Sequence, residues 1–408
     1  MKKPAGVLLA LAYLAFISLG LPDTVLGVAW PSLRHEFGVS QSAMGAVLAA
    51  GMTGYFSSGL LAGSLMRKIG VGGLLTASGG CVALALVGYA AAPSWWSFFP
   101  VGLIMGLGSG AIDSGLNGYA ARNFSVRQLN WLHACWGIGA STGPVIMTAA
   151  IARGFGYRVG YAVLASLLGA MALAFLLTRR LWDEPTSARE ASPSPSAVLS
   201  SELDVDPGFV GALRSSRVWL SMLSFFMYTG LEATLGQWCF SLMREGRGLP
   251  VEVAGSWTAA YWAGLTVGRV TFGFVVDRLG ADRLLRCASG GAVTGALLFA
   301  LDTGAVGRLG LLFCGLSLAP VFPTLMARTP ARLGAGIARH AVGFQVSAAT
   351  LGSSMLPACV GVLIGQVGLG AISGAAVVLA LAFLVVHESL LRATRPRSVG
   401  LSPLGSAP

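Results

Sequence analysis

Three carboxylic acids, Asp23, Asp113 and Glu232, lie in segments that are otherwise apolar enough to cross a membrane. A carboxylate in hydrocarbon costs at least about 2.5 kcal/mol, so each must face protein or water and is a functional candidate by default. The chemistry open to such a group is the gain and loss of a proton. We therefore expect these residues to exchange protons as part of the protein's function.

Asp113 belongs to a helical face that the stretch "GLGSGAIDSGLNG" defines. Gly106, Gly110, Asp113 and Asn117 follow one another at steps of four, three and four, so they share one side of a helix. The glycines permit close helix contact, and the Asn117 amide offers a substrate both a donor and an acceptor. The alternative is a buried, hydrogen-bonded pair that only locks helices together.

The other two acids also have alternative interpretations. Asp23 follows Pro22, which frees backbone groups and is typical of a water-lined hinge, so Asp23 is either a coupling acid or a helix-break residue. Glu232 is either a coupling acid or the structural partner of Arg269 in the next apolar segment. Because carriers use such pairs as switchable locks, these two roles are compatible.

His133 and Trp136 share a face of a further apolar segment. Histidine relays protons near neutral pH, and an aromatic ring suits the C–H side of a sugar. The alternative is a packed polar residue beside an interfacial tryptophan. Further candidates for substrate binding share polar or indole groups within apolar segments, for which packing is the alternative: Gln237, Trp262 and Gln345.

The elements that position these residues are membrane helices. Hydrophobic residues make up 55% of the 408 residues and charged residues 11%, against about 25% charged in globular proteins. Apolar runs of about 20 residues, the length that spans a bilayer, succeed one another along the chain. The sequence predicts twelve spans, at 7–31, 43–66, 71–92, 95–120, 130–153, 158–178, 217–243, 253–276, 282–303, 307–327, 338–364 and 368–391.

The basic residues set the orientation. Most of the 27 Lys and Arg residues fall on one side when both termini are placed inside. This positive-inside asymmetry places the termini in the cytoplasm and the protein in the inner membrane. The net charge of +11 is thus an orientation signal, and we expect no nucleic-acid partner.

Enzyme chemistry is not indicated. The six cysteines are scattered, with no CxxC or His/Cys cluster, so neither a disulfide framework nor a metal site is expected. The sequence lacks GxxxxGK[ST] and HExxH. Its GxSxG match, "GASTG" at 139–143, lies inside a span, as does "GSGAIDSG". We expect no catalytic residues and no cofactor.

The chain divides into two repeated halves. "GSLMRKIG" at 63–70 matches "GFVVDRLG" at 273–280. We expect an N-terminal six-helix half at 1–178, a cytoplasmic linker at 179–216, a second half at 217–391 and a disordered tail at 392–408. Asp277 and Arg278 lie where the eighth span meets the cytoplasmic loop. We interpret them as gate residues, with Asp277 binding a helix N-terminus or a basic residue across the inner gate.

The sequence resembles the major facilitator superfamily over essentially its whole length. "GFVVDRLGADR" is close to the loop signature of that superfamily, and its first-half copy has Arg67 where the aspartate belongs. Within the superfamily, several segments resemble the fucose/glucose–proton symporter group: "GAIDSGLNG", "LNWLHACWGIGASTGP", "YTGLEATLGQW", "GLTVGRVTFGFV" and "APVFPT". The group usually has glutamate at the place of Asp113.

The resemblance implies two halves related by a pseudo-twofold axis and a proton-coupled, monomeric importer of a monosaccharide. The main alternative is a proton-driven exporter of small hydrophobic or amphiphilic compounds, whose cavity would be larger and more apolar. A non-transporting membrane sensor is less consistent with the chain, because no sizeable soluble segment is present in the sequence.

Overall fold

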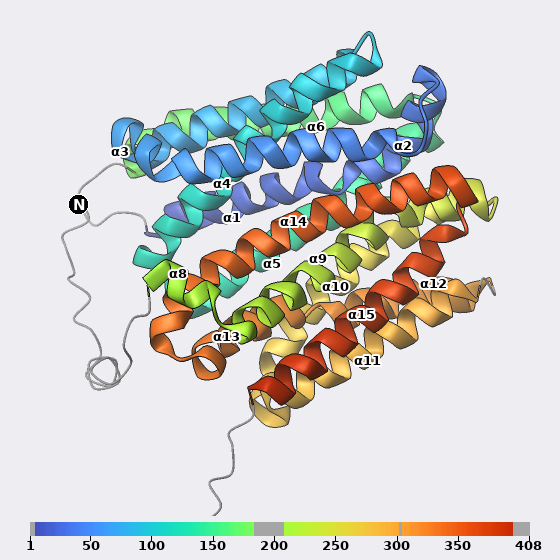
Figure 1. The fold of residues 1–408 in the computed structure, drawn as a ribbon. Coiled ribbons are helices and arrows are strands. Elements are labelled where there is room, and N and C mark those ends of the chain that lie inside the picture. Colours follow the sequence, from blue (N-terminus) through green and yellow to red (C-terminus); the bar gives the residue numbers. More distant parts are fainter. Residues whose placement is uncertain (1–4, 183–207, 302–303, 395–408) are drawn as a thin grey trace, which may run out of the picture.

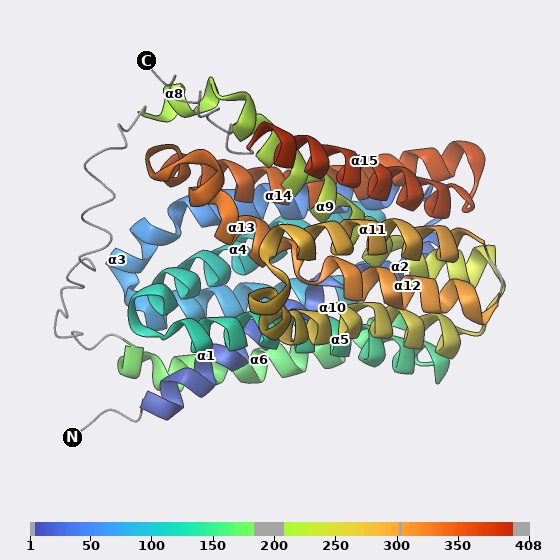
Figure 2. The same cartoon turned by 90° about the horizontal axis from the view of Figure 1, so that it is seen from below.

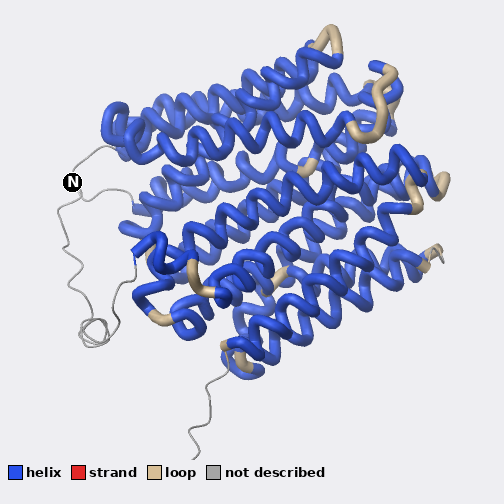
Figure 3. The backbone as a smooth tube through the Cα atoms, in the orientation of Figure 1, coloured by secondary structure: helices blue, strands red, loops and turns tan. Residues whose placement is uncertain are grey.

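The computed structural model describes residues 5–182, 208–301 and 304–394, and within these ranges every regular element is a helix. Figure 3 shows long helices joined by short loops, with no strand in the part of the chain that is described. The all-helical membrane class predicted from the apolar runs is confirmed.

Six spans form the first half. Its helices are α1 (Ala5–Asp23), α2 (Val25–Phe37), α3 (Ala43–Ala91), the 3-10 turn η1 (Trp95–Ser97), α4 (Phe98–Asn123), α5 (Val126–Ala152) and α6 (Gly156–Trp182). Helix α3 pairs with α4 and α6, and α1 pairs with α5.

The second half has a corresponding set. Its helices are α8 (Gly208–Leu213), α9 (Ser216–Ser241), the π-helical turn η2 (Leu242–Gly246), α10 (Val251–Leu279), α11 (Ala281–Ala300), α12 (Ala305–Leu318), α13 (Val321–Leu333), α14 (Ala335–Val367) and α15 (Ala371–Ala393). Helix α9 packs between α14 and α15, and α11 pairs with α12.

The twelve expected spans map onto these helices with three local differences. The first span is divided between α1 and α2 at Thr24, where Pro22 led us to expect a break. The second and third spans form the single element α3, which turns at Gly70 with φ 73°, a conformation that glycine adopts without strain. The tenth span, expected as one helix, is divided between α12 and α13, because Pro320 lacks the N–H that a continuous helix requires.

Length and composition alone identify eight candidate membrane spans, of which α3 supplies two passes. Helices α9, α10 and α11 complete the set of twelve with 26, 29 and 20 residues, and they are less apolar. Helices α9 and α10 carry Glu232 and Arg269. Polar groups of this kind face the interior of a bundle rather than lipid. Their presence accounts for the lower hydropathy of α9 and α10.

The two six-helix halves lie side by side. Figure 1 shows the first half, in blue and green, above the second half, in yellow and red, with their helices running in similar directions. Figure 2 shows the same arrangement from below. The halves meet through three helix pairs, α5 with α10, α3 with α14, and α2 with α9.

The bundle has two ends, which are distinguished here by the chain. The linker end is where α6 ends, α9 begins, α1 begins and α15 ends, at the left of Figure 1. The opposite end holds the end of α2 and the turn η2. The expected linker at 179–216 and tail at 392–408 fall mostly outside the described residues, although α6 continues to Trp182 and α15 to Ala393.

Candidate functional site

The break in the first span places Asp23 at the seam between the halves. Thr24 separates α1 from α2, and its Oγ1 donates to the Ala140 carbonyl of α5 at 2.8 Å. The backbone carbonyl of Asp23 is one of the last in α1, and helix ends leave such carbonyls without partners in the helix. It accepts a hydrogen bond from Gln237 Nε2 of α9 at 3.1 Å. The two halves therefore share a hydrogen bond at the broken helix.

The Asp23 carboxylate lies beside Trp136 on α5. Trp136 Nε1 donates to Asp23 Oδ2 at 3.0 Å, and the Asp23 side chain is exposed. Close packing of α1 on α5 makes this contact possible, because a Cβ on Gly20 would lie only 2.0 Å from the Trp136 carbonyl oxygen. Two predicted site residues are thus brought together.

Asp113 is held by two neutral donors within the first half. Tyr55 Oη of α3 donates to Asp113 Oδ2 at 2.5 Å, and Asn117 Nδ2 donates to Oδ1 at 2.9 Å. The shared face of Asp113 and Asn117 predicted from the helix period is present. The pattern did not reveal Tyr55, since a tyrosine in an apolar helix is also typical of a packed core.

Glu232 forms the ion pair predicted with Arg269. Arg269 Nη2 lies 3.4 Å from Glu232 Oε1, and the two side chains are 20% and 12% exposed. Tyr228 Oη donates to the other carboxylate oxygen, and Tyr261 Oη donates to the Glu232 backbone carbonyl at 2.9 Å. Each half therefore places a tyrosine hydroxyl on its carboxylate, Tyr55 in the first and Tyr228 in the second.

Trp136 connects these groups across the seam. Arg269 Cζ lies 5.1 Å from the centre of the Trp136 ring, within the range of a cation–π contact. Trp262 of α10 meets the same ring edge-on, with ring centres 5.9 Å apart. One indole of the first half thus contacts an arginine and an indole of the second.

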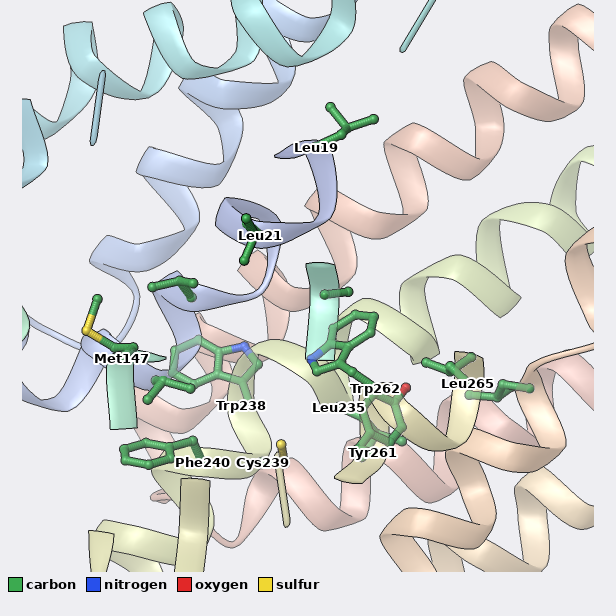
Figure 4. Close-up of a cluster of buried hydrophobic side chains, with 14 of the residues drawn as sticks. Leu19, Leu21, Met147, Leu235, Trp238, Cys239, Phe240, Tyr261, Trp262 and Leu265 are labelled. Atoms are coloured by element: carbon green, nitrogen blue, oxygen red, sulfur yellow. The ribbon is translucent and has the colours of Figure 1, made fainter. Parts of the chain in front are cut away.

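The apolar surroundings of the seam come from both halves. Figure 4 shows a cluster of buried side chains from both halves, among them Leu21 and Met147 of the first half and Trp238 and Trp262 of the second. These side chains are buried. Electrostatic interactions there act in a lower dielectric than in water.

Two predicted residues retain unused polar atoms in this region. The Gln237 Oε1 atom and the Trp262 Nε1 atom are buried and have no hydrogen-bond partner among the described residues. Unsatisfied buried polar atoms cost about 1–3 kcal/mol each. They are therefore well placed to bind a ligand that reaches the seam.

The remaining predicted residues lie in different settings. His133 is exposed and meets the Phe16 ring edge-on at 5.3 Å. Gln345 is fully buried, and its amide bonds to Ser221 at 2.6 Å and Thr329 at 3.0 Å, so it joins helices of the second half and stands apart from the carboxylates.

The predicted gate residues lie at the end of α10. Arg278 is exposed there, and the side chain of Asp277 lies outside the described residues. The described part of the chain also contains no group of His, Cys, Asp or Glu side chains able to hold a metal ion.

A cross-half lock at the opposite end was not found from the sequence. The Glu245 carboxylate of η2 lies 2.9 Å from Arg34 Nη2 and 2.8 Å from His35 Nε2, both of α2. Gln41 Nε2 donates to its second oxygen at 3.2 Å. We call Arg34, His35, Gln41 and Glu245 the outer lock, a name that follows the orientation predicted from the basic residues.

Backbone packing closes the same end. A Cβ on Gly27 of α2 would lie 2.4 Å from the Gln237 carbonyl oxygen of α9. A Cβ on Gly255 of α10 would lie 2.0 Å from Thr148 Oγ1 of α5. Side chains larger than hydrogen do not fit at either glycine without displacing the other half. The halves are therefore in contact from the carboxylates to the opposite end.

Comparison with known proteins agrees with this architecture. Bypass of stop codon protein 6 from Saccharomyces cerevisiae is 25% identical over 379 residues, 87% of this chain and 76% of the yeast protein. The glucose/mannose transporter GlcP from Bacillus subtilis is 21% identical over 317 residues, 76% of this chain and 77% of the relative.

Solved structures share the fold. The nucleoside transporter NupG superposes with a TM-score of 0.73 at 15% identity, covering 96% of this chain and 98% of NupG. A variant of the E. coli fucose:proton symporter FucP superposes with a TM-score of 0.63 at 18% identity, covering 97% of this chain and 100% of FucP.

The sequence profile of the Major Facilitator Superfamily matches residues 12–357, most of the 408-residue chain. Together with the twelve spans and the seam between two halves, this match shows a carrier of small molecules rather than an enzyme. The chain belongs to the Major Facilitator Superfamily.

Proposed function

We propose that this carrier couples the uptake of a monosaccharide to the entry of protons, with the linker end and both termini in the cytoplasm. The observation that carries the proposal is the setting of Asp113. This carboxylate is bound by Tyr55 and Asn117, which are neutral donors, and no described cation forms an ion pair with it. A carboxylate without a fixed counter-ion can gain and lose a proton without breaking a salt bridge.

Glu232 differs in this respect, because it forms an ion pair with Arg269. Protonation of Glu232 releases the guanidinium, which then remains bound mainly by Trp136. We assign Asp113 the primary coupling role and the Glu232–Arg269 pair the role of a switch between the halves. Asp23 supplies a third carboxylate, next to Trp136.

A polyhydroxylated substrate matches the groups at the seam. Carboxylates accept from sugar hydroxyls, while Asn117, Gln237 and Trp262 offer amide and indole groups. The names of two similar proteins, the glucose/mannose transporter GlcP and the fucose:proton symporter FucP, support this substrate class.

Transport follows from alternating closure of the two ends. The described contacts close the opposite end, at the outer lock and at Gly27. With the linker end in the cytoplasm, this is the state that releases substrate inside. Uptake then requires the outer lock to open, substrate and proton to enter, and the halves to close again behind them.

Reconstitution tests the proposal. Purified carrier in liposomes should exchange a labelled sugar from a panel of hexoses and deoxyhexoses, and an inward pH gradient should concentrate that sugar. Exchange without gradient-driven accumulation would remove the proton coupling. Efflux of hydrophobic dyes with no sugar exchange would favour the exporter alternative.

A further inference from the structure

A cavity at the opposite end lies between the two halves. Its volume is about 450 Å³, and its walls come from α2 and α5 of the first half and from α9, η2 and α10 of the second. This is the right-hand end in Figure 1, away from the linker. It is within the size range of about 300–1,000 Å³ that small-molecule sites occupy.

The polar wall of the cavity is part of the outer lock. His35 and Glu245 line it, and Arg34 joins Glu245 from α2. Arg244 also lines it, with an exposed side chain, and its Nη1 donates to the Leu249 carbonyl at 3.1 Å. The Glu245 carboxylate is bound by Arg34 and His35, and no described carboxylate forms an ion pair with Arg244. Arg244 is left as the cation that faces a ligand.

The facing wall is apolar. Ile151 of α5, Phe240 of α9 and Val251 of α10 line it, together with Pro31 of α2. Phe240 is almost fully buried, which fixes its position. An apolar body would pack on this wall while its charged group reaches Arg244.

We infer that this cavity is a second binding site, for a small aromatic carboxylate that enters from the outer face. Its carboxylate binds the Arg244 guanidinium and its ring packs against Ile151 and Val251. The site is separate from the carboxylates at the seam and does not depend on which substrate the carrier moves.

The position of the site makes binding depend on conformation. Its walls belong to both halves, so opening of the outer lock separates Arg244 and Phe240 from Ile151 and His35. A ligand with contacts in only one state stabilises that state in proportion to its differential affinity. An aromatic carboxylate outside the cell therefore holds the outer lock closed and slows transport.

Calorimetric titration of the purified carrier with sodium benzoate tests the site, with benzyl alcohol as the uncharged control. We expect benzoate to bind and benzyl alcohol not to bind. Arg244→Gln should weaken benzoate binding about tenfold or more, because it removes the charge-assisted bond. Arg283→Gln, at an exposed arginine of the linker end, should bind benzoate as the unmodified protein does.

Several results would overturn the proposal. The first is the absence of benzoate binding up to about 10 mM, a concentration at which a millimolar site is largely filled. The second is equal binding of benzyl alcohol and benzoate. The third is an unchanged benzoate affinity in Arg244→Gln. Arg269→Gln separates this site from the seam. Loss of benzoate binding in a folded Arg269→Gln protein, with binding retained in Arg244→Gln, would place the ligand on Arg269 instead.

A second measurement tests the dependence on conformation. Gly27→Ala adds a methyl group where α2 meets α9 and so disfavours closure of the opposite end, while Gly63→Ala adds one in open space. Benzoate affinity in the two variants should follow the fraction of closed carrier, measured by spin-label distances across the opposite end. Affinity that does not follow that fraction would rule out a site shared by both halves.

Discussion

The guanidinium of Arg269 lies 5.1 Å from the centre of the Trp136 ring, although the two residues belong to different halves. The same indole donates to Asp23, and the same guanidinium approaches Glu232 at 3.4 Å. Separation of the halves must therefore change the surroundings of both carboxylates together. This contact is the direct structural link between the acids of the two halves.

The first prediction concerns Trp136. Trp136→Phe keeps an aromatic ring beneath Arg269 and removes the Nε1 donor to Asp23. We expect KM for the transported sugar to rise about 2- to 10-fold in counterflow, the equivalent of one hydrogen bond. Trp136→Leu, which also removes the ring, should have the larger effect and should be non-additive with Arg269→Gln. Additive effects would show that the contact does not couple the halves.

The second prediction concerns proton coupling at Asp113. Asp113→Asn imitates the protonated acid permanently, so exchange by a loaded carrier should continue while return of the empty carrier fails. We expect counterflow to remain substantial and accumulation under a pH gradient to disappear. Glu232→Gln should show a milder form of the same defect. If Asp113→Asn still concentrates substrate, the coupling role passes to Asp23 or Glu232.

The third prediction concerns the close contact at Gly27. Gly27→Ala should destabilise the closed opposite end by about 1–3 kcal/mol, the usual cost of an overpacked contact. Nitroxide labels at Ser94→Cys and Gly370→Cys, both in exposed turns of that end, would report a longer distance population. Gly63→Ala is the control, because nothing lies within 4 Å of its added Cβ. Identical distance distributions would contradict the steric argument.

The fourth prediction concerns the outer lock. Glu245→Gln removes the charge that binds Arg34 and His35 and leaves one amide oxygen as acceptor. Exposed ion pairs contribute about 0.2–1 kcal/mol each, so the open population should rise about 2- to 10-fold. A cysteine at Thr148, covered by Gly255 in the closed state, should then react faster with an impermeant maleimide. An unchanged rate would make the lock a passive contact.

The fifth prediction concerns orientation. In a cysteine-free background, Ser194→Cys in the expected linker should resist labelling from outside intact cells. Ser94→Cys, exposed at the opposite end, should label readily. Ready labelling of Ser194→Cys would reverse the proposed orientation.

Sequence patterns were sufficient to locate most of the spans and to single out the three acids within them, because a carboxylate in an apolar run is unusual and has few structural explanations. The coupling role of the acids stays a prediction. The Glu232–Arg269 pair and the shared face of Asp113 and Asn117 follow from the same reasoning. The division of the tenth span at Pro320 could not be predicted from the sequence pattern, since proline occurs both within membrane helices and at their breaks.

The partners of the acids could not be predicted in this way. Tyr55 and Tyr228 resemble ordinary core residues in sequence, and their role depends on which helix faces point at each other. The outer lock joins Arg34 to Glu245, which lie 211 positions apart in the sequence, and only the packing of the two halves brings them together. Gln345 shows the converse. The sequence left both substrate binding and packing open for it, and in the structure Ser221 and Thr329 bind its amide.

The interruption of the first span at Thr24 has a mechanical consequence. Helix α1 is packed on α5, within its own half, whereas α2 contacts both halves. Its Glu36 pairs with Arg158 of α6, and the outer lock and Gly27 meet the second half. The Asp23 carbonyl at the joint is bonded to Gln237, so bending there need not break the main-chain ladder of either helix. The joint at Thr24 therefore lies between a part of the span that packs within its own half and a part that also touches the other half. Bending at Thr24 lets the second part adjust as the outer lock opens and closes.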